Sequence, residues 1–119
     1  MILINISEKL KLFNEYWTPK KIGELNGQQL LLAKLKGEFI WHTHQNEDEL
    51  FMIVKGQLKI KFRDKSVVLN KGELFIIPKG IEHKPIAEKE VHVLLFEPLE
   101  IKHTGGVKSN LTVETFEAI

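Results

Sequence analysis

Two histidines separated by a single residue, with an acidic residue shortly after them, form the first group in the chain that could do chemistry. His42 and His44 are two positions apart, so on an extended strand both imidazoles leave the same face. Glu49 follows at an odd offset that would put it on the opposite face of one continuous strand. A turn through residues 45–48 would instead move Glu49 onto an antiparallel neighbouring strand. The two imidazoles and the carboxylate could then converge on one metal ion.

A third histidine follows a predicted bend later in the chain. Gly72 and Gly80 permit tight turns with positive φ, and Pro78 ends the strand that precedes the second turn. His83 comes directly after this bend. A histidine held there can point into the mouth of a barrel and serve as a fourth ligand.

Short apolar segments between turn signals indicate the framework that must position these side chains. Leu58, Ile60 and Phe62 alternate with polar residues, which is typical of a strand with one face in water. Many short strands at such spacing favour a β-sandwich or barrel. The predicted strands cover residues 50–54, 57–62, 67–69, 74–77 and 91–96.

Helical character is confined to the N-terminal region. Ser7 can cap a short helix over residues 8–14, in which Leu10 and Phe13 share one face. The C-terminal residues 103–119 show little periodicity and are interpreted as an extended arm or a lid. We expect one domain over residues 1–119, with a core barrel at about 20–100 between an N-terminal segment of 1–19 and an arm of 101–119.

Composition excludes several functional classes. The 17 Lys and Arg residues balance 16 Asp and Glu residues, and this net charge of +1 is not that of a nucleic-acid-binding protein. There is no cysteine, so neither a disulfide framework nor a cysteine-ligated zinc site is available. No apolar stretch approaches the roughly 20 residues that a bilayer requires, and the N-terminus does not resemble a signal peptide. We therefore expect a cytoplasmic protein that binds neither membrane nor nucleic acid.

The two groups of residues resemble the paired motifs of the cupin superfamily. The match departs from the usual pattern in the spacing between Gly37 and His42, and in Ala87, which stands where the second motif usually ends in Asn. Neither departure removes a ligand. The first motif is represented by Gly37, His42, His44, Glu49 and Gly56, and the second by Gly72, Pro78, Gly80 and His83.

The resemblance implies a fold, a cofactor and an assembly. The fold is an all-β double-stranded β-helix (jelly-roll) barrel, here with a short N-terminal helix, of the small single-domain kind often described as mannose-6-phosphate isomerase-like. The assembly is a homodimer. The resemblance also implies one divalent metal ion, with Zn, Fe, Mn, Ni and Cu all compatible with such a donor set. Its ligands would be His42, His44, Glu49 and His83.

Three functions remain open. The first is a metal-dependent enzyme acting on a small organic molecule by isomerase or dioxygenase type chemistry, with His92, Glu82 or Glu97 as acid–base candidates. The second is a non-catalytic module that binds or senses a small molecule. The third is a structural barrel whose histidines merely pack, which is disfavoured because buried converging polar groups are costly without a cation. Arg63 is the only arginine, so a dedicated phosphate site is also disfavoured.

Other conspicuous residues have structural interpretations. Glu47 and Asp48 are interpreted as solvated turn residues, His92 as a half-buried strand residue and His103 as a surface residue. Trp41 alternates outward if His42 points inward, which favours core or dimer packing. The predicted barrel lining and core include Phe39, Phe51, Phe62, Phe75 and Phe96.

Overall fold

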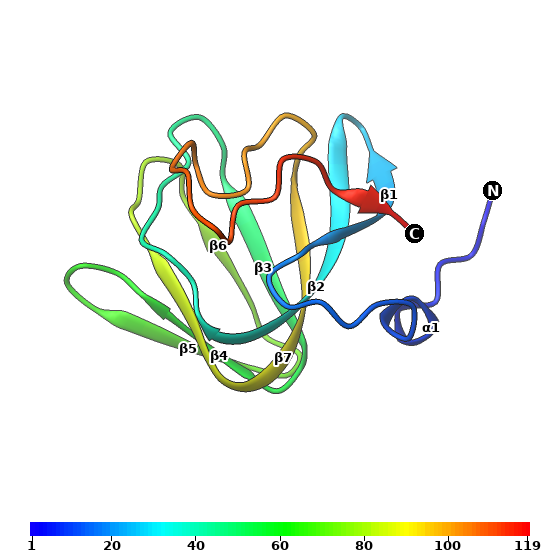
Figure 1. Ribbon diagram of the computed structural model, residues 1–119, viewed down its shortest axis with the longest axis horizontal. Coiled ribbons are helices and arrows are strands. Elements are labelled where there is room, and N and C mark those ends of the chain that lie inside the picture. The colour runs from blue at the N-terminus through cyan, green and yellow to red at the C-terminus, as the bar shows by residue number, and fades with distance from the viewer.

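The structure is a computed structural model that describes all 119 residues. Its regular elements are eight strands and one short helix. No helix has the length and apolar character needed to cross a membrane. In chain order the elements are α1 (Ile6–Leu10), β1 (Lys20–Leu25), β2 (Gln28–Glu38), β3 (Glu49–Lys55), β4 (Gln57–Lys61), β5 (Ser66–Asn70), β6 (Leu74–Ile77), β7 (Lys84–Pro98) and β8 (Glu117–Ala118) (Figure 1).

Strand β7 connects the two sides of the barrel. One of its edges pairs antiparallel with β2, while the other pairs with β4 around Pro85 and with β3 from His92 to Phe96. Strands β6, β5 and β1 extend these pairings from β3, β4 and β2 respectively. The predicted all-β jelly-roll barrel with a short N-terminal helix is confirmed. The prediction for residues 91–96 was too short, because β7 continues through a polar stretch from Lys84.

The main core fills the barrel. Leu31, Ile53, Leu58 and Val93 come from four different strands and are fully or almost fully buried there. Of the predicted aromatic core, Phe39, Phe51 and Phe62 are buried in this cluster, Phe75 packs against it, and Phe96 is half-buried outside it.

Strand β2 was not predicted, because it is covered on both faces and so lacks the alternation of a half-exposed strand. Leu31 and Ala33 face the barrel core, whereas Leu32 belongs to a second, smaller core beneath α1. Leu10 and Phe13 complete that second core, as their predicted shared face requires.

The helix begins earlier than predicted. Its N-cap is Asn5, whose side chain accepts a hydrogen bond from the backbone N–H of Glu8 at 2.9 Å, and not Ser7. An asparagine at this position satisfies one of the free N–H groups of the first turn. The helix ends at Leu10, so the predicted extension to Asn14 is wrong.

The C-terminal residues return to their own barrel. Strand β8 pairs parallel with β1, and the backbone N–H of Ile119 donates to the carbonyl oxygen of Lys21 at 3.0 Å. Leu111 and Phe116 pack against the main core. The tail therefore crosses the end of the barrel instead of extending away to cover a second subunit (Figure 1).

Candidate metal centre

The two histidine motifs are held together by backbone hydrogen bonds. His42 and His83 form an antiparallel bridge in which each backbone N–H donates to the carbonyl oxygen of the other, at 3.0 and 2.9 Å. The N–H of Gly80 donates to the carbonyl oxygen of His44 at 2.8 Å. The strand neighbour of the His42 segment is therefore the His83 segment, and not the strand of Glu49 as the sequence suggested. Glu49 opens β3 and pairs with Ile77 of β6.

Two of the imidazoles are oriented by the backbone. The Nδ1 atoms of His42 and His83 each lie 2.9 Å from the carbonyl oxygen two residues earlier, that of Ile40 or Ile81. A carbonyl partner fixes the proton on Nδ1 and leaves the Nε2 lone pair free for a metal. The two backbone carbonyls thus select, for His42 and His83, the tautomer that a metal ligand needs.

The four predicted side chains meet at one point. All four are buried, and one potential ligand atom from each lies within 4.8 Å of the others. Glu49 Oε1 is 3.5 Å from His83 Nε2 and 3.6 Å from His44 Nε2. These three atoms have no hydrogen-bond partner. Buried polar atoms without partners are costly. A cation placed among them would satisfy all three, so the cluster could hold a metal ion.

The ionisation of the cluster suits a cation. Burial, followed by the nearby His83, lowers the pKa of His42 to about 4, and burial also lowers the pKa of His44. Burial alone would raise the pKa of the Glu49 carboxyl, but the adjacent His83, Glu97 and His44 outweigh it and lower that pKa to about 2. At neutral pH the cluster therefore presents neutral His42 and His44 beside an ionised carboxylate.

These shifts predict acid sensitivity of the metal-free protein. Unfolding returns the pKa of His42 from about 4 to its ordinary 6.5, so below pH 6.5 the unfolded state binds more protons and stability falls as the pH falls toward 4. The loss from His42 alone is about 3 kcal/mol. His44 and His103, whose pKa values are also lowered, add to it, while the raised pKa of Glu97 opposes it above pH 4.5. Urea unfolding of chelator-treated protein at pH 7 and pH 4.5 measures the change, and equal stabilities would contradict it. The His42→Gln variant, which cannot titrate there, should lose less.

A narrow pocket opens beside the cluster. It is lined by His42 and Glu49 together with an apolar wall in which Trp17 stacks on Phe39 at 4.8 Å between ring centroids. The volume available to the centres of water molecules is only about 30 Å³. The remaining apolar lining comes from Pro19, Ala33, Leu35, Phe51, Pro85, Val93 and Leu95.

Two further titratable side chains line the pocket. Glu97 is 2 % exposed and its Oε2 atom has no hydrogen-bond partner. Burial, and then the negative charge of Glu49, raise the pKa of Glu97 well above its ordinary value. His103 also lines the pocket, and burial lowers its pKa to about 4. The interpretation of His103 as a surface residue is therefore wrong. An isolated histidine in an aperiodic tail carries no signal of this position.

The other candidates lie away from the cluster. Glu82 is exposed and accepts a hydrogen bond from Arg63 Nε at 2.7 Å, while the Arg63 guanidinium lies 3.8 Å from the ring centre of Trp41. His92 Nε2 contacts Glu90 Oε2 at 2.6 Å and takes no part in the metal cluster. Among the three acid–base candidates of the sequence, only Glu97 reaches the pocket.

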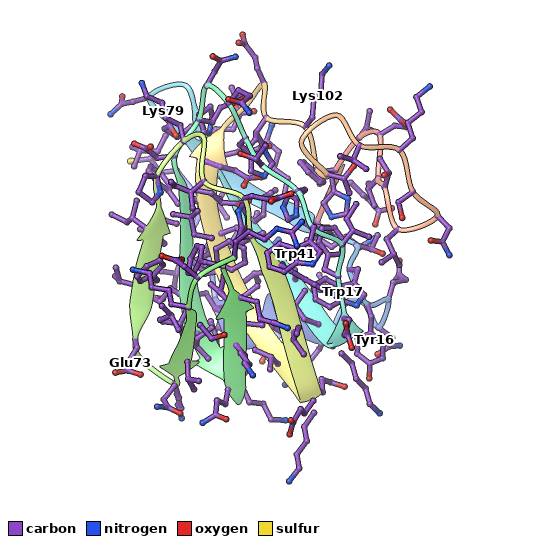
Figure 2. The ribbon with its side chains drawn as sticks, turned by 90° about the vertical axis from the view of Figure 1, so that its left-hand side faces the viewer. Tyr16, Trp17, Trp41, Glu73, Lys79 and Lys102 are labelled. Atoms are coloured by element: carbon purple, nitrogen blue, oxygen red, sulfur yellow. The ribbon has the colours of Figure 1, made fainter.

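The turn residues have roles at the end of the barrel where the motifs meet. Asp48 accepts a hydrogen bond from the backbone N–H of Lys79 at 2.8 Å and so joins the turn before β3 to the turn before His83. Lys79 and Lys102 of the tail lie at the same end of the barrel, whereas Glu73 lies at the opposite end (Figure 2).

Comparisons with known proteins agree with this geometry. The family model described as "Cupin domain" matches residues 31–97. A cupin-2 domain containing protein from Shewanella frigidimarina is 46% identical, with a TM-score of 0.80 over 81% of this chain and 94% of that one. The protein NMB1881 from Neisseria meningitidis is 34% identical, with a TM-score of 0.75 over 82% of this chain and 99% of that one. An uncharacterized Bacillus subtilis protein, YdbB, is 42% identical over 64 residues, which span 53% of this chain and 57% of that protein.

Proposed function

The chain belongs to the cupin family, and from that premise we propose that it is a metal-dependent enzyme acting on a small organic molecule. In this proposal His42, His44, Glu49 and His83 hold one divalent metal ion. The observation that carries it is the set of partnerless buried atoms, His44 Nε2, Glu49 Oε1 and His83 Nε2, which face one another across the cluster. A divalent cation among them would satisfy all three atoms at once, which offsets the cost of burying them unpaired.

The donor set limits the metal and its chemistry. Three imidazole nitrogens and one carboxylate oxygen suit Fe, Mn, Ni, Cu or Zn. Bound there, such an ion would supply Lewis-acid polarisation of a carbonyl or hydroxyl oxygen for isomerase type chemistry. Dioxygenase type chemistry would instead use a redox-active ion of this set, Fe, Mn, Ni or Cu.

The residues around the cluster form an apolar pocket wall and a candidate proton donor for the substrate. Trp17 and Phe39 form an apolar wall of the pocket. Glu97, whose pKa is raised by burial and by the Glu49 charge, lies beside the cluster as the candidate proton donor. A carboxyl group with a raised pKa in a pocket is the expected form of a general acid. A second candidate, a binding module without catalysis, is favoured by the mainly apolar lining of the pocket.

Metal loading is the first test of the proposal. Chelator-treated protein is titrated separately with Mn²⁺, Fe²⁺, Co²⁺, Ni²⁺, Cu²⁺ and Zn²⁺, and bound metal is measured by mass spectrometry. We expect one ion per chain. At a hundred times Kd, binding stabilises the fold by about 2.7 kcal/mol and raises Tm by roughly 10 °C. If no ion binds stoichiometrically or raises Tm, the proposed metal site is wrong.

Catalysis is tested on the loaded protein. Oxygen uptake and NMR spectra are followed with a panel of small hydroxycarbonyl compounds, with Glu97→Gln as the comparison variant. Turnover that falls in the variant while metal content stays constant supports the enzyme. Binding of these compounds without turnover supports the binding module instead.

We also propose that residues 1–119 form a single domain, which is supported by the one main core shared by β2, β3, β4 and β7. The exposed apolar side chains of Ile2 and Leu3 are compatible with the homodimer predicted from the sequence. The homodimer and the cytoplasmic location stay predictions.

A further inference from the structure

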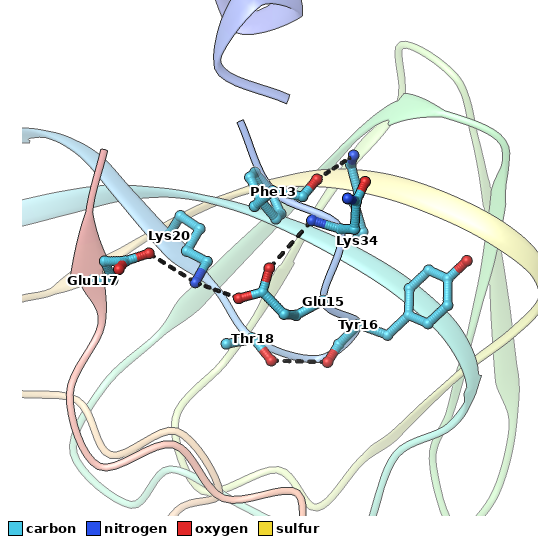
Figure 3. A network of polar contacts seen from close by, with 8 residues as sticks. Phe13, Glu15, Tyr16, Thr18, Lys20, Lys34 and Glu117 are labelled. Carbon is cyan, nitrogen blue, oxygen red and sulfur yellow. Dashed lines mark hydrogen bonds and ion pairs between the residues drawn. The ribbon is translucent and has the colours of Figure 1, made fainter. Parts of the chain in front are cut away.

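The segment that follows β7 contributes His103 to the pocket and is fixed at both ends. At its start, the backbone N–H of Leu99 donates to the carbonyl oxygen of Gly27 at 3.3 Å. At its end, Glu117 forms an ion pair with the buried Lys20 at 3.0 Å (Figure 3). Lys9 Nζ donates to the carbonyl oxygen of Ile119 at 2.7 Å. Residues 99–116 are therefore a strap with two anchored ends.

The middle of this strap rests on the loop that carries two of the proposed ligands. Gly105 has φ +62°, and a Cβ atom added to it would overlap the carbonyl oxygen of Thr43, which lies between His42 and His44. A side chain at position 105 is thus incompatible with this contact. The neighbouring Gly106 has φ +91° but open space around it. Both glycines therefore have a left-handed backbone conformation, but only Gly105 lies against the backbone of Thr43.

The strap delivers His103 to the pocket. Its ring contacts Phe39 and Phe116, with ring centroids 5.1 and 5.8 Å apart. The backbone N–H of Val113 donates to His103 Nδ1 at 3.0 Å. Because Nδ1 accepts, the proton of the neutral ring is on Nε2. His103 therefore offers a single N–H donor to a pocket that also contains His42 and Glu49.

The free volume of the pocket is too small for an organic ligand. About 30 Å³ is open to the centres of water molecules, which is room for two or three waters at roughly 10–15 Å³ each. A molecule with even a few heavy atoms needs more space than that. The strap contributes His103 to the lining and lies outside the barrel sheet, as do Trp17 and Pro19, so displacement of the strap would enlarge the pocket.

The charge of the site selects the ligand. The proposed ligand set contains one carboxylate, Glu49, and three imidazoles, so a divalent ion beside an uncharged Glu97 would leave a net charge of +1. A monoanion would neutralise it. The N–H donor of His103 suits a negatively charged oxygen, and the aromatic wall of Trp17 and Phe39 suits an apolar remainder.

We propose that residues 99–116 form a lid that opens to admit a small monoanionic oxygen ligand of the metal, and that on closing the lid places His103 Nε2–H on that ligand. This inference rests on the proposed metal site and specifies what the site takes. His103 acts as a positioning residue, which binds the oxygen of the ligand without coordinating the metal.

The test uses Co²⁺ as the metal and acetohydroxamate as the probe, followed by visible absorption of the full-length protein. His103→Phe keeps the packing of a ring between Phe39 and Phe116 but removes the donor. We expect Co²⁺ affinity to be unchanged and acetohydroxamate to bind about 10- to 100-fold more weakly, as for loss of a hydrogen bond to a charged group. Equal probe affinity in the wild type and the variant would overturn the role of His103.

The lid is tested separately with Gly105→Ala, and Gly106→Ala is the matched control. Both variants carry the cost of a left-handed alanine, but only the first displaces the strap from Thr43. We expect acetohydroxamate to dissociate at least tenfold faster from Gly105→Ala than from Gly106→Ala. A thermal unfolding transition in each variant verifies that both are folded. Equal dissociation rates would overturn the lid. A wild type that fails to bind Co²⁺ would overturn the metal site itself, a result distinct from either of these.

Discussion

Replacing His83 by alanine should weaken metal binding by more than about 100-fold, since changes to residues that merely support metal ligands already cost about 10- to 100-fold. His83 is 1 % exposed, and its Nε2 atom faces Glu49 Oε1 at 3.5 Å with no other partner. The variant keeps the backbone bridge to His42, because both hydrogen bonds use main-chain atoms. The measurement is a competition titration with Zn²⁺ or Co²⁺ against a chelating indicator.

His92→Ala is the matched control for this prediction. His92 is also a buried histidine of the barrel wall, yet it contacts Glu90 and takes no part in the metal cluster. The His92→Ala variant should retain wild-type metal affinity. Equal losses in the two variants would show that the effect reflects damage to the barrel, and no loss in either would remove His83 from the ligand set.

The second large effect concerns the core that supports the cluster. Ile53→Ala should lower the free energy of unfolding by about 2–5 kcal/mol, the usual cost of truncating a buried aliphatic side chain to alanine. Ile53 is 1 % exposed, and it lies on β3, the strand that Glu49 opens. Its neighbours in the main core come from several strands, so the cavity cannot be filled by the movement of one loop.

Ile76→Ala provides the same change of side chain on the adjacent strand. Ile76 is 53 % exposed on β6. Its replacement by alanine should therefore lower the free energy of unfolding by less than about 1 kcal/mol. Urea unfolding of the two metal-free variants at one pH gives the comparison. A similar loss for both isoleucines would contradict the assignment of inner and outer faces of β3 and β6.

The metal cluster was predictable because its information is local. His42 and His44 are close in sequence, and turn residues announce the bends that bring Glu49 and His83 to them. What the sequence did not reveal was the pairing, because the bridge between His42 and His83 joins segments about 40 residues apart. The position of His103 was predicted wrongly for the same reason, because it depends on the contact between residues 99–116 and the distant loop that carries His42 and His44.

The fold was predictable where a strand has one exposed face, but not where a strand is buried on both faces. Strands with one wet face, such as β4, show their alternation in the sequence, and their predicted bounds agree closely with the structure. Strand β2 shows an uninterrupted apolar run because Leu31 and Leu32 enter two different cores. Helix α1 was placed too late because Asn5 and Ser7 are both good caps, and local sequence does not choose between them.

The central position of β7 also has a consequence for the order of events during synthesis. Strands β2, β3 and β4 all find their partner in residues 84–98, so most of the barrel ladder cannot close until the last third of the chain has left the ribosome. Until then the completed barrel does not hold His83 beside His42, His44 and Glu49. Under the proposed metal site, the nascent chain is expected to bind its ion late, together with closure of the barrel.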